Sequence, residues 1–158
     1  MLTQMSIRNF ALIEQMNISF KDGITIFTGE TGAGKSILMD AFSILLGERA
    51  SSEFIRHGKD SFVIDGIFDI ANHQSLLDLL QSKNILVEDN QLILSRSFNT
   101  SGKSIILAND QPIPLKALKE IGLLLADIHG QYSNQKLLNP DSHHEYLDGY
   151  NQAGSKAY

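Results

Sequence analysis

The chain has 158 residues, of which 42% are hydrophobic and 20% charged, a composition ordinary for a soluble globular domain. Its net charge of −5 excludes a globally basic nucleic-acid-binding protein, so any contact with DNA must come from a local patch. The absence of cysteine excludes disulfides and thiolate metal sites and fits a reducing cytoplasm. The sequence shows neither a signal peptide nor an apolar run of the roughly 20 residues that a membrane helix needs.

The N-terminal part of the chain mixes apolar and polar residues in the way typical of strands. Strands are predicted over residues 2–10 and 16–20, and the turn Lys21-Asp22-Gly23 leads into a short apolar strand, Ile24–Phe27. After Lys35 the apolar residues change to helical spacing, and Gly47 is a good stop for that helix.

The remaining elements alternate between strands and helices. They are a strand over 62–70, a helix capped by Asn72 and running to about residue 82, strands over 92–98 and 104–108 around the turn Asn99–Lys103, a helix from about Leu115, and a last helix that starts at Asn139-Pro140-Asp141 and runs on without a clear stop. This order predicts a mixed α/β domain with an antiparallel element at its N-terminus.

Residues 29–36 match the phosphate-binding pattern G-x-x-x-x-G-K-[ST] in full. The eight residues are Gly29, Glu30, Thr31, Gly32, Ala33, Gly34, Lys35 and Ser36. Glycines let backbone N–H groups turn toward phosphate oxygens, and the following helix adds its positive N-terminal end. We therefore expect Lys35 to reach the β- and γ-phosphates of a nucleotide and Ser36 to offer its hydroxyl to Mg²⁺.

A second Gly-Lys-Ser triplet, Gly102–Ser104, does not fit the same pattern. Ser97 stands where the first glycine should be, and a β run follows instead of an amphipathic helix. The sequence Asn99-Thr100-Ser101-Gly102 is turn chemistry, so we interpret this triplet as a hairpin loop and Lys103 as a surface charge.

The acid that a P-loop ATPase needs on a second strand is not obvious. Only Leu123–Asp127 resembles four apolar residues followed by an acid, and Ile128 rather than glutamate comes next. The same stretch continues the apolar spacing that begins at Leu115, which is typical of a helix. Two interpretations remain, a Walker B strand ending at Asp127 and a buried element that ends at a polar loop.

Five segments together resemble the RecN family of bacterial DNA-repair proteins, which are SMC-like members of the ABC-type ATPases. The segments are Ser6–Glu14 (SIRNFALIE), Thr28–Ser36 (TGETGAGKS), Leu46–Ala50 (LGERA), Ile55–Gly58 (IRHG) and Asp127–Gln131 (DIHGQ). They occur in the order and spacing of the family, and the resemblance extends over residues 1–150.

The resemblance implies an α/β P-loop NTPase fold of the ABC/SMC head type, present only as the N-terminal lobe over 1–140, with 141–158 as the helix leading into a coiled coil. Family members are several times longer and complete the head with a returning half that carries the signature motif, Walker B and the switch histidine. The implied function is ATP binding, with Mg²⁺, in DNA double-strand-break repair and recombination. Hydrolysis would require the missing half.

The resemblance also assigns residues and partners. Gln131 matches the Q-loop glutamine that touches Mg²⁺ and the attacking water, with Asp127 and His129 as supporting residues, although Tyr132, Ser133 and Asn134 depart from the family's histidines. Arg49, with Arg56 nearby, is the candidate DNA contact, and surface charges are the alternative. The implied partners are DNA, the C-terminal half of the same head and a second head in a homodimer, on the bacterial nucleoid in the cytoplasm, with no membrane.

Two other functions remain open on the residues alone. A self-contained small P-loop kinase would use Asp127 as its Mg²⁺ acid, but the four arginines of the chain are too scattered for a lid. A non-enzymatic interaction module would carry a vestigial P-loop, and the intact Lys35 and Ser36 argue against it.

Overall fold

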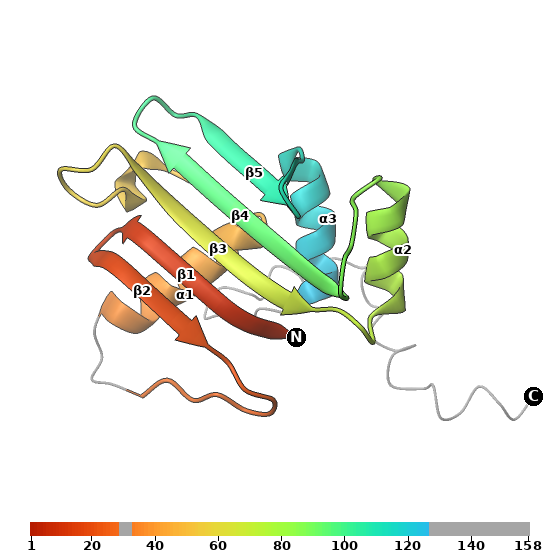
Figure 1. The fold of residues 1–158 in the computed structure, drawn as a ribbon. Coiled ribbons are helices and arrows are strands. Elements are labelled where there is room, and N and C mark those ends of the chain that lie inside the picture. The colour runs from red at the N-terminus through yellow and green to blue at the C-terminus, as the bar shows by residue number, and fades with distance from the viewer. Residues whose placement is uncertain (29–32, 127–158) are drawn as a thin grey trace, which may run out of the picture. The chain divides into compact units, whose positions relative to one another are not determined.

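A six-stranded antiparallel sheet organises the structure, with strand order β2-β1-β3-β4-β5-β6 (Figure 1). The computed structural model describes residues 1–28 and 33–126. The strands are β1 (Leu2–Phe10), β2 (Ile13–Ser19), β3 (Ser61–Asp69), β4 (Gln91–Asn99), β5 (Ser104–Ala108) and β6 (Gln111–Pro112). All pairings within this described sheet are antiparallel, so the parallel part of the expected mixed sheet does not lie in these residues.

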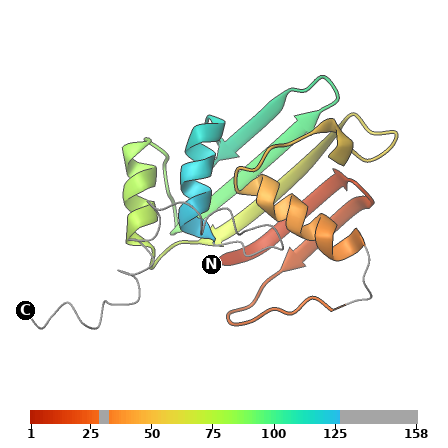
Figure 2. The same ribbon diagram turned by 180° about the vertical axis from the view of Figure 1, so that it is seen from behind.

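Helices cover one face of the sheet. They are α1 (Ala33–Leu45), the 3₁₀ turn η1 (Ser52–Phe54), α2 (Gln74–Ser82) and α3 (Leu115–Leu125). Seen from behind, α1 crosses this face and α3 lies on it near one end of the sheet, whereas α2 lies outside α3 (Figure 2). The lysine–glutamate pair Lys83–Glu120, at 2.9 Å, ties α2 to α3.

The core forms between this covered face and the two helices α1 and α3. On β3 the alternate residues Phe62, Ile64 and Phe68 are buried, as the period of two predicts. The helices contribute their buried faces in return, with Ala41, Ile44 and Leu45 from α1 and Ala117, Leu118 and Ile121 from α3. The opposite face of the sheet carries half-buried and polar side chains, so the domain is two layers deep in its described part.

The hairpin expected around Asn99–Lys103 is confirmed. β4 and β5 pair on either side of it, and the Asn99 side-chain oxygen accepts hydrogen bonds from the backbone N–H groups of Ser101 and Lys103 at 3.1 and 2.9 Å. Gly102 has a φ of 82°, which glycine adopts without steric cost. The second Gly-Lys-Ser triplet is therefore a turn.

The cap of α2 is His73, one residue later than predicted. Its Nδ1 accepts from the Leu76 backbone N–H at 3.4 Å, and its Nε2 bonds the Leu124 carbonyl at 2.7 Å. Asn72 precedes the cap and takes no part in it. The prediction was wrong because the His73 ring bonds the start of α2 and the end of α3 together. The contact with α3 cannot be seen in the local sequence around Asn72.

The strand predicted over Ile24–Phe27 was also wrong, because these residues form no regular structure here. Ile24 is 92% exposed and Ile26 is 76% exposed. A strand needs a neighbour to satisfy its backbone groups, and no strand of the described sheet pairs with this segment. The apolar residues are present as the pattern requires, but no strand among the described residues pairs with them.

The Walker B interpretation of Leu123–Asp127 does not fit the structure. Leu123–Leu125 are the last turn of α3, and Leu123 is 62% exposed, whereas a Walker B segment is a buried strand. Asp127, His129, Gln131 and the predicted terminal helix lie outside the described residues.

A close crossing joins the end of α1 to α3. An added Cβ on Gly122 would stand only 2.0 Å from the Leu46 carbonyl oxygen, and one on Gly47 would stand 3.0 Å from the Cα of Lys119. Gly47 also has a φ of 116°, which suits glycine at a helix C-terminus. Both contacts are with backbone, so neither can be relieved by turning a side chain.

We expect Gly122→Ala to lower the free energy of unfolding by roughly 1–3 kcal/mol, because the new methyl group would force α3 away from Leu46. An ordinary helical glycine behaves in the opposite way, since alanine there stabilises by about 1 kcal/mol. Urea unfolding followed by circular dichroism measures whether the free energy of unfolding falls or rises in the variant. Leu123→Ala, on the exposed neighbour, is the control and should change stability by about 0.5 kcal/mol or less. A more stable Gly122→Ala variant would contradict the close crossing.

Candidate phosphate-binding site

The last four residues of the P-loop motif form the first turn of α1. This helix has 13 residues and begins at Ala33, and Gly34, Lys35 and Ser36 are exposed. The first N–H groups of a helix have no partner within it and carry the positive end of its dipole. No acidic side chain lies in this first turn, so no carboxylate there competes with a phosphate. Gly29, Glu30, Thr31 and Gly32 lie outside the described residues.

The other end of α1 is fixed by a buried arginine. Arg96 projects from β4, is 2% exposed, and donates from Nη1 to the carbonyl oxygens of Ile44 and Glu48. The Ile44 carbonyl, in the last turn of α1, also accepts from the Gly47 backbone N–H at 3.2 Å, and Glu48 follows the helix, so the guanidinium ties the helix end and the loop after it to β4. Burial lowers the pKa of Arg96, and attraction to the Glu48 carboxylate partly opposes the shift.

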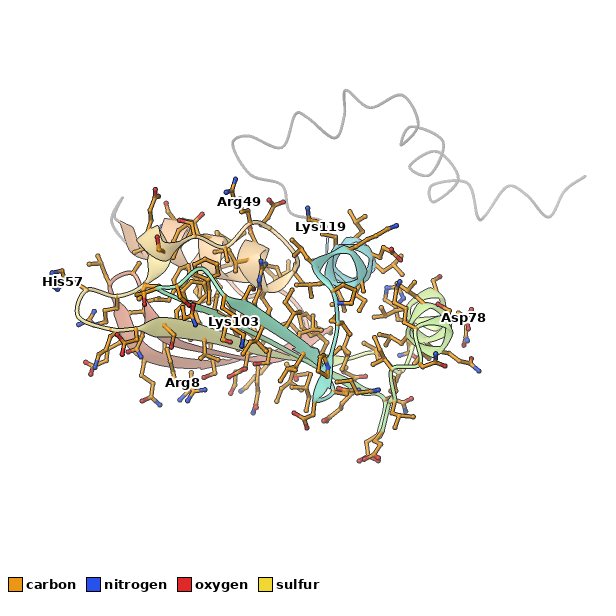
Figure 3. All side chains as sticks on the ribbon, turned by 90° about the horizontal axis from the view of Figure 1, so that it is seen from above. Arg8, Arg49, His57, Asp78, Lys103 and Lys119 are labelled. Carbon is orange, nitrogen blue, oxygen red and sulfur yellow. The ribbon has the colours of Figure 1, made fainter. Side chains whose placement is uncertain are left out.

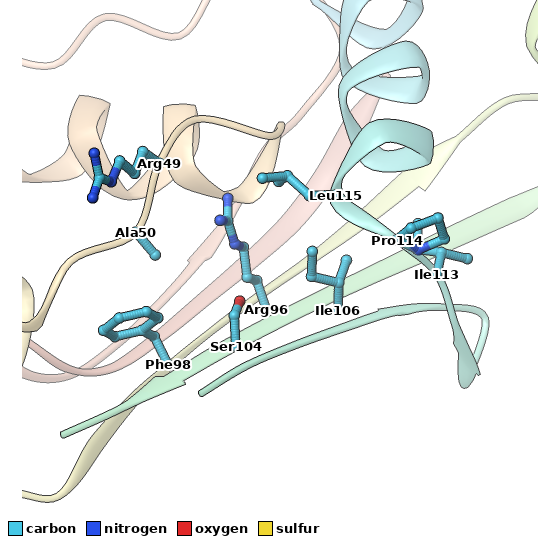
Figure 4. Close-up of a pocket in the computed structure, with 9 residues that line it drawn as sticks. All are labelled: Arg49, Ala50, Arg96, Phe98, Ser104, Ile106, Ile113, Pro114 and Leu115. Atoms are coloured by element: carbon cyan, nitrogen blue, oxygen red, sulfur yellow. The ribbon is translucent and has the colours of Figure 1, made fainter. Parts of the chain in front are cut away.

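Arg49 follows α1 and lies on the helix-covered side of the sheet (Figure 3). It is exposed, and together with Arg96 it lines a cavity of about 350 Å³ (Figure 4). The other walls come from β4, β5 and the start of α3 and are formed by Phe98, Ser104, Ile106, Pro114 and Leu115. The candidate DNA contact is therefore placed beside a cavity.

Arg56 has a structural contact. Its Nη1 donates to the Leu12 carbonyl at 2.7 Å, and its backbone N–H donates to the Asn9 carbonyl at 2.9 Å. The Phe54 ring stacks on Phe10 with centroids 5.0 Å apart. These contacts hold the loop after η1 against the β1–β2 turn, so Arg56 serves the fold whatever else it contacts.

Arg8 points to the sheet face away from α1 (Figure 3). It pairs with Asp65 at 3.7 Å, and Asp65 in turn accepts a hydrogen bond from the Ser95 hydroxyl at 2.5 Å. This polar row belongs to the uncovered face of the sheet, opposite α1.

Sequence reasoning missed Arg96, although a signal for it exists. Along β4 the residues Leu92, Leu94, Arg96 and Phe98 alternate on one side, and the first three are buried. An arginine in the inward phase of an alternating strand must find partners inside, and here they are helix-terminal carbonyls. Separately, no helix among the described residues is long and apolar enough to cross a membrane.

Comparison with known proteins confirms the resemblance to the RecN family. A family model described as an AAA domain matches residues 4–145. The DNA repair protein RecN of Bacillus subtilis is 43% identical over 150 residues, which are 95% of this chain and 26% of that protein. RecN of Vibrio cholerae is 38% identical, over 95% of this chain and 27% of that protein. The chain thus spans about a quarter of the length of these relatives.

Solved structures confirm the fold class. A chain from a structure concerned with ATP-driven dimerisation and DNA-stimulated activation of SMC ATPases matches with a TM-score of 0.66 at 16% identity, covering 93% of this chain and 97% of that one. The Smc head domain of Pyrococcus furiosus, with an extended coiled coil and bound to the C-terminal domain of ScpA, gives a TM-score of 0.67 at 16% identity, over 92% and 40% of the two chains. At these identities the likeness concerns the fold alone, which is that of part of an SMC-type head.

We expect Arg96→Met to lower the free energy of unfolding by roughly 2–4 kcal/mol, because it removes the guanidinium donor from the Ile44 carbonyl at the end of α1 and from the Glu48 carbonyl just after it. Arg49→Met is the matched control on the same cavity, where an exposed side chain should cost about 0.5 kcal/mol or less. Chemical unfolding of both variants measures the difference between their free energies of unfolding. Equal stabilities would show that Arg96 does not hold the helix end.

Proposed function

We propose, from the premise that the chain belongs to the AAA domain family, that it is the ATP-binding N-terminal half-head of a RecN-type DNA-repair ATPase. The observation that carries this proposal is the exposed first turn of α1, which presents the Gly34-Lys35-Ser36 end of a complete P-loop motif. A helix N-terminus with this sequence is suited to phosphate by its backbone donors, its dipole and its lysine.

ATP with Mg²⁺ is the proposed ligand of this turn. Residues 29–34 would supply backbone N–H groups, Lys35 a charge for the β- and γ-phosphates, and Ser36 a hydroxyl for the metal. Bound Mg²⁺ would neutralise phosphate charge. Gln131, in a segment outside the described residues, is proposed as a second Mg²⁺ ligand that also orients water, because an amide oxygen suits the metal and either end of an amide can bind water.

The proposed partners of this half-head are its own C-terminal half and a second head. The apolar segment Ile24–Phe27 is exposed and without a neighbouring strand in the described sheet, which supports a strand partner supplied by the rest of the protein. A RecN-type head would then associate with another through bound ATP, and hydrolysis would separate the two.

DNA repair and recombination in the bacterial cytoplasm, on the nucleoid, is the proposed setting. Bacterial relatives at 43% and 38% identity are named DNA repair proteins, which supports it. Arg49 is the proposed DNA contact because it is exposed beyond α1, and Arg56 is the weaker candidate because its guanidinium already bonds the Leu12 carbonyl. The alternative of a self-contained kinase is not favoured, since the leucines before Asp127 end a helix instead of forming a strand.

We expect Lys35→Ala to abolish ATP-dependent head association in the full-length protein that contains this chain, because the phosphates lose their nearest cation. The association constant measured by analytical ultracentrifugation with a slowly hydrolysed ATP analogue should fall at least about tenfold, equivalent to 1.4 kcal/mol. Lys59→Ala, on an exposed lysine after η1, is the matched control and should leave association unchanged. Retained association in Lys35→Ala would refute the role given to this lysine.

The 158-residue chain alone should hydrolyse ATP near background, with or without double-stranded DNA, because the returning half of the head is needed for hydrolysis. A steady-state phosphate-release assay measures this. Turnover well above background that is lost in Asp127→Asn would overturn the proposal in favour of the self-contained enzyme.

The same assay on the full-length protein tests the DNA contact. DNA should stimulate turnover, and Arg49→Ala should remove most of that stimulation while leaving turnover without DNA unchanged. Lys103→Ala, on the hairpin, serves as the control for loss of one surface charge. Full stimulation in Arg49→Ala would remove this residue from the DNA interface.

A further inference from the structure

The buried Arg96 guanidinium has no carboxylate within ion-pair distance among the described residues, whose ion pairs are Arg8–Asp65 and Lys83–Glu120. Buried charges in proteins are normally paired. The two carbonyls that accept from Arg96 carry only partial negative charge, and the Glu48 carboxylate attracts the guanidinium from beyond ion-pair distance. Moreover, the Nε atom is buried and has no hydrogen-bond partner in the part of the chain that the structure describes.

A cavity adjoins this unsatisfied arginine. Its volume of about 350 Å³ falls at the low end of small-molecule sites, which range over about 300–1,000 Å³. Its walls combine the Arg96 side chain, an apolar surface and one hydroxyl, and Arg49 lies at the edge with its guanidinium turned away from Arg96, as Figure 4 shows. The residues that matter are Arg49, Arg96, Phe98, Ser104, Ile106 and Leu115.

We propose that this cavity binds a small organic acid, with its carboxylate toward Arg96 and its apolar body against Phe98 and Ile106. The site is separate from the P-loop, because it lies beside the C-terminal end of α1 and the P-loop lies at the N-terminal end. The proposal therefore goes beyond the nucleotide function and does not depend on it.

The chemistry of the walls selects a monocarboxylate. A planar carboxylate accepts hydrogen bonds from a guanidinium in favourable geometry and would bring a full negative charge into contact with Arg96. A phosphate, doubly charged and strongly hydrated, would lose more hydration than the mostly apolar walls can replace. A neutral amide could accept a hydrogen bond but would leave the charge uncompensated.

The arginine side-chain signals of the isotope-labelled 158-residue chain provide a direct test. The chain has four arginines, so its Nε–Hε spectrum is simple, and the Arg96 signal is assigned by its loss in Arg96→Lys. Phenylacetate is the probe, and we expect it to shift the Arg96 signal with a saturating dissociation constant on the order of 1 mM or below. Neutral phenylacetamide should bind at least about tenfold more weakly. An unmoved Arg96 signal, or equal binding of the amide, would overturn the proposal.

A blocking variant locates the binding. Ser104 is an exposed rim residue of the cavity, so Ser104→Tyr should fill the entrance without disturbing the core and should remove the shift of the Arg96 signal. Ile105→Tyr changes the next residue on β5, which is 46% exposed and does not line the cavity, and it should bind phenylacetate normally. Unchanged binding in Ser104→Tyr would refute this location.

The bound carboxylate could belong to a free acid or to an acidic side chain of a protein. Comparing the dissociation constants of phenylacetate and of a capped dipeptide, acetyl-Phe-Glu-amide, distinguishes the two. Tighter binding of phenylacetate assigns the site to a free acid, as proposed. Tighter binding of the dipeptide would assign it to an acidic side chain of a protein partner and overturn the free-acid assignment.

Discussion

The hydrogen bonds from Arg96 to the carbonyls at the end of α1 are the constraint on which the rest of the described structure depends. They connect the middle of the sheet to the helix that carries the P-loop, across a core that is otherwise apolar. Directional bonds of this kind fix the position of a helix end, whereas apolar packing alone tolerates small shifts. Gly47 and Gly122 add a second constraint, because they let α3 approach the same helix end at backbone distance. The C-terminal end of α1 is thus held from two sides, and Lys35 and Ser36 stand exposed at the other end.

The exposed apolar segment before the P-loop stands beside a sheet whose own strands are fully paired in the described residues. The antiparallel sheet satisfies its own ladder from β2 to β6, and its covered face is closed by α1 and α3. Ile24 and Ile26 remain in solvent because their backbone has no strand to pair with in the described residues. An unpaired apolar segment of this kind is costly in isolation, since it exposes both side chains and hydrogen-bonding groups that would support a strand. The half-head proposal gives this cost a physical reason, because the pairing strand would come from the remainder of a chain about four times as long, judged from the 26% coverage of the Bacillus subtilis relative.

Local sequence patterns predicted most of the described elements, and the failures share a cause. Alternation identified β1, β3 and β4, and the Asn99–Lys103 turn was recognised from its residue types, because these signals act over a few residues. The cap at His73, the unpaired Ile24–Phe27 and the partners of Arg96 were missed because each depends on a group distant in sequence: the Leu124 carbonyl, an absent strand and the end of α1. For the candidate site, the motif predicted the helix that follows it, whereas the phosphate contact of Lys35 stays a prediction from the motif and the roles of Gln131 and Arg49 stay predictions that rest on resemblance.

The two ends of α1 have opposite electrostatic requirements, and the structure meets them with opposite means. At the N-terminal end the helix dipole favours an anion. The first turn carries no carboxylate, so no side chain there would compete with a phosphate for the positive end of the dipole. At the C-terminal end the dipole favours a cation, and Arg96 supplies one from the sheet. The same guanidinium leaves its Nε without a hydrogen-bond partner among the described residues, and both Arg96 and Arg49 line the adjoining cavity. The same residue that completes the P-loop helix therefore creates an anionic preference at its far end. An acid bound there would strengthen the hold of the sheet on α1, because both the ligand and the helix carbonyls would share one guanidinium.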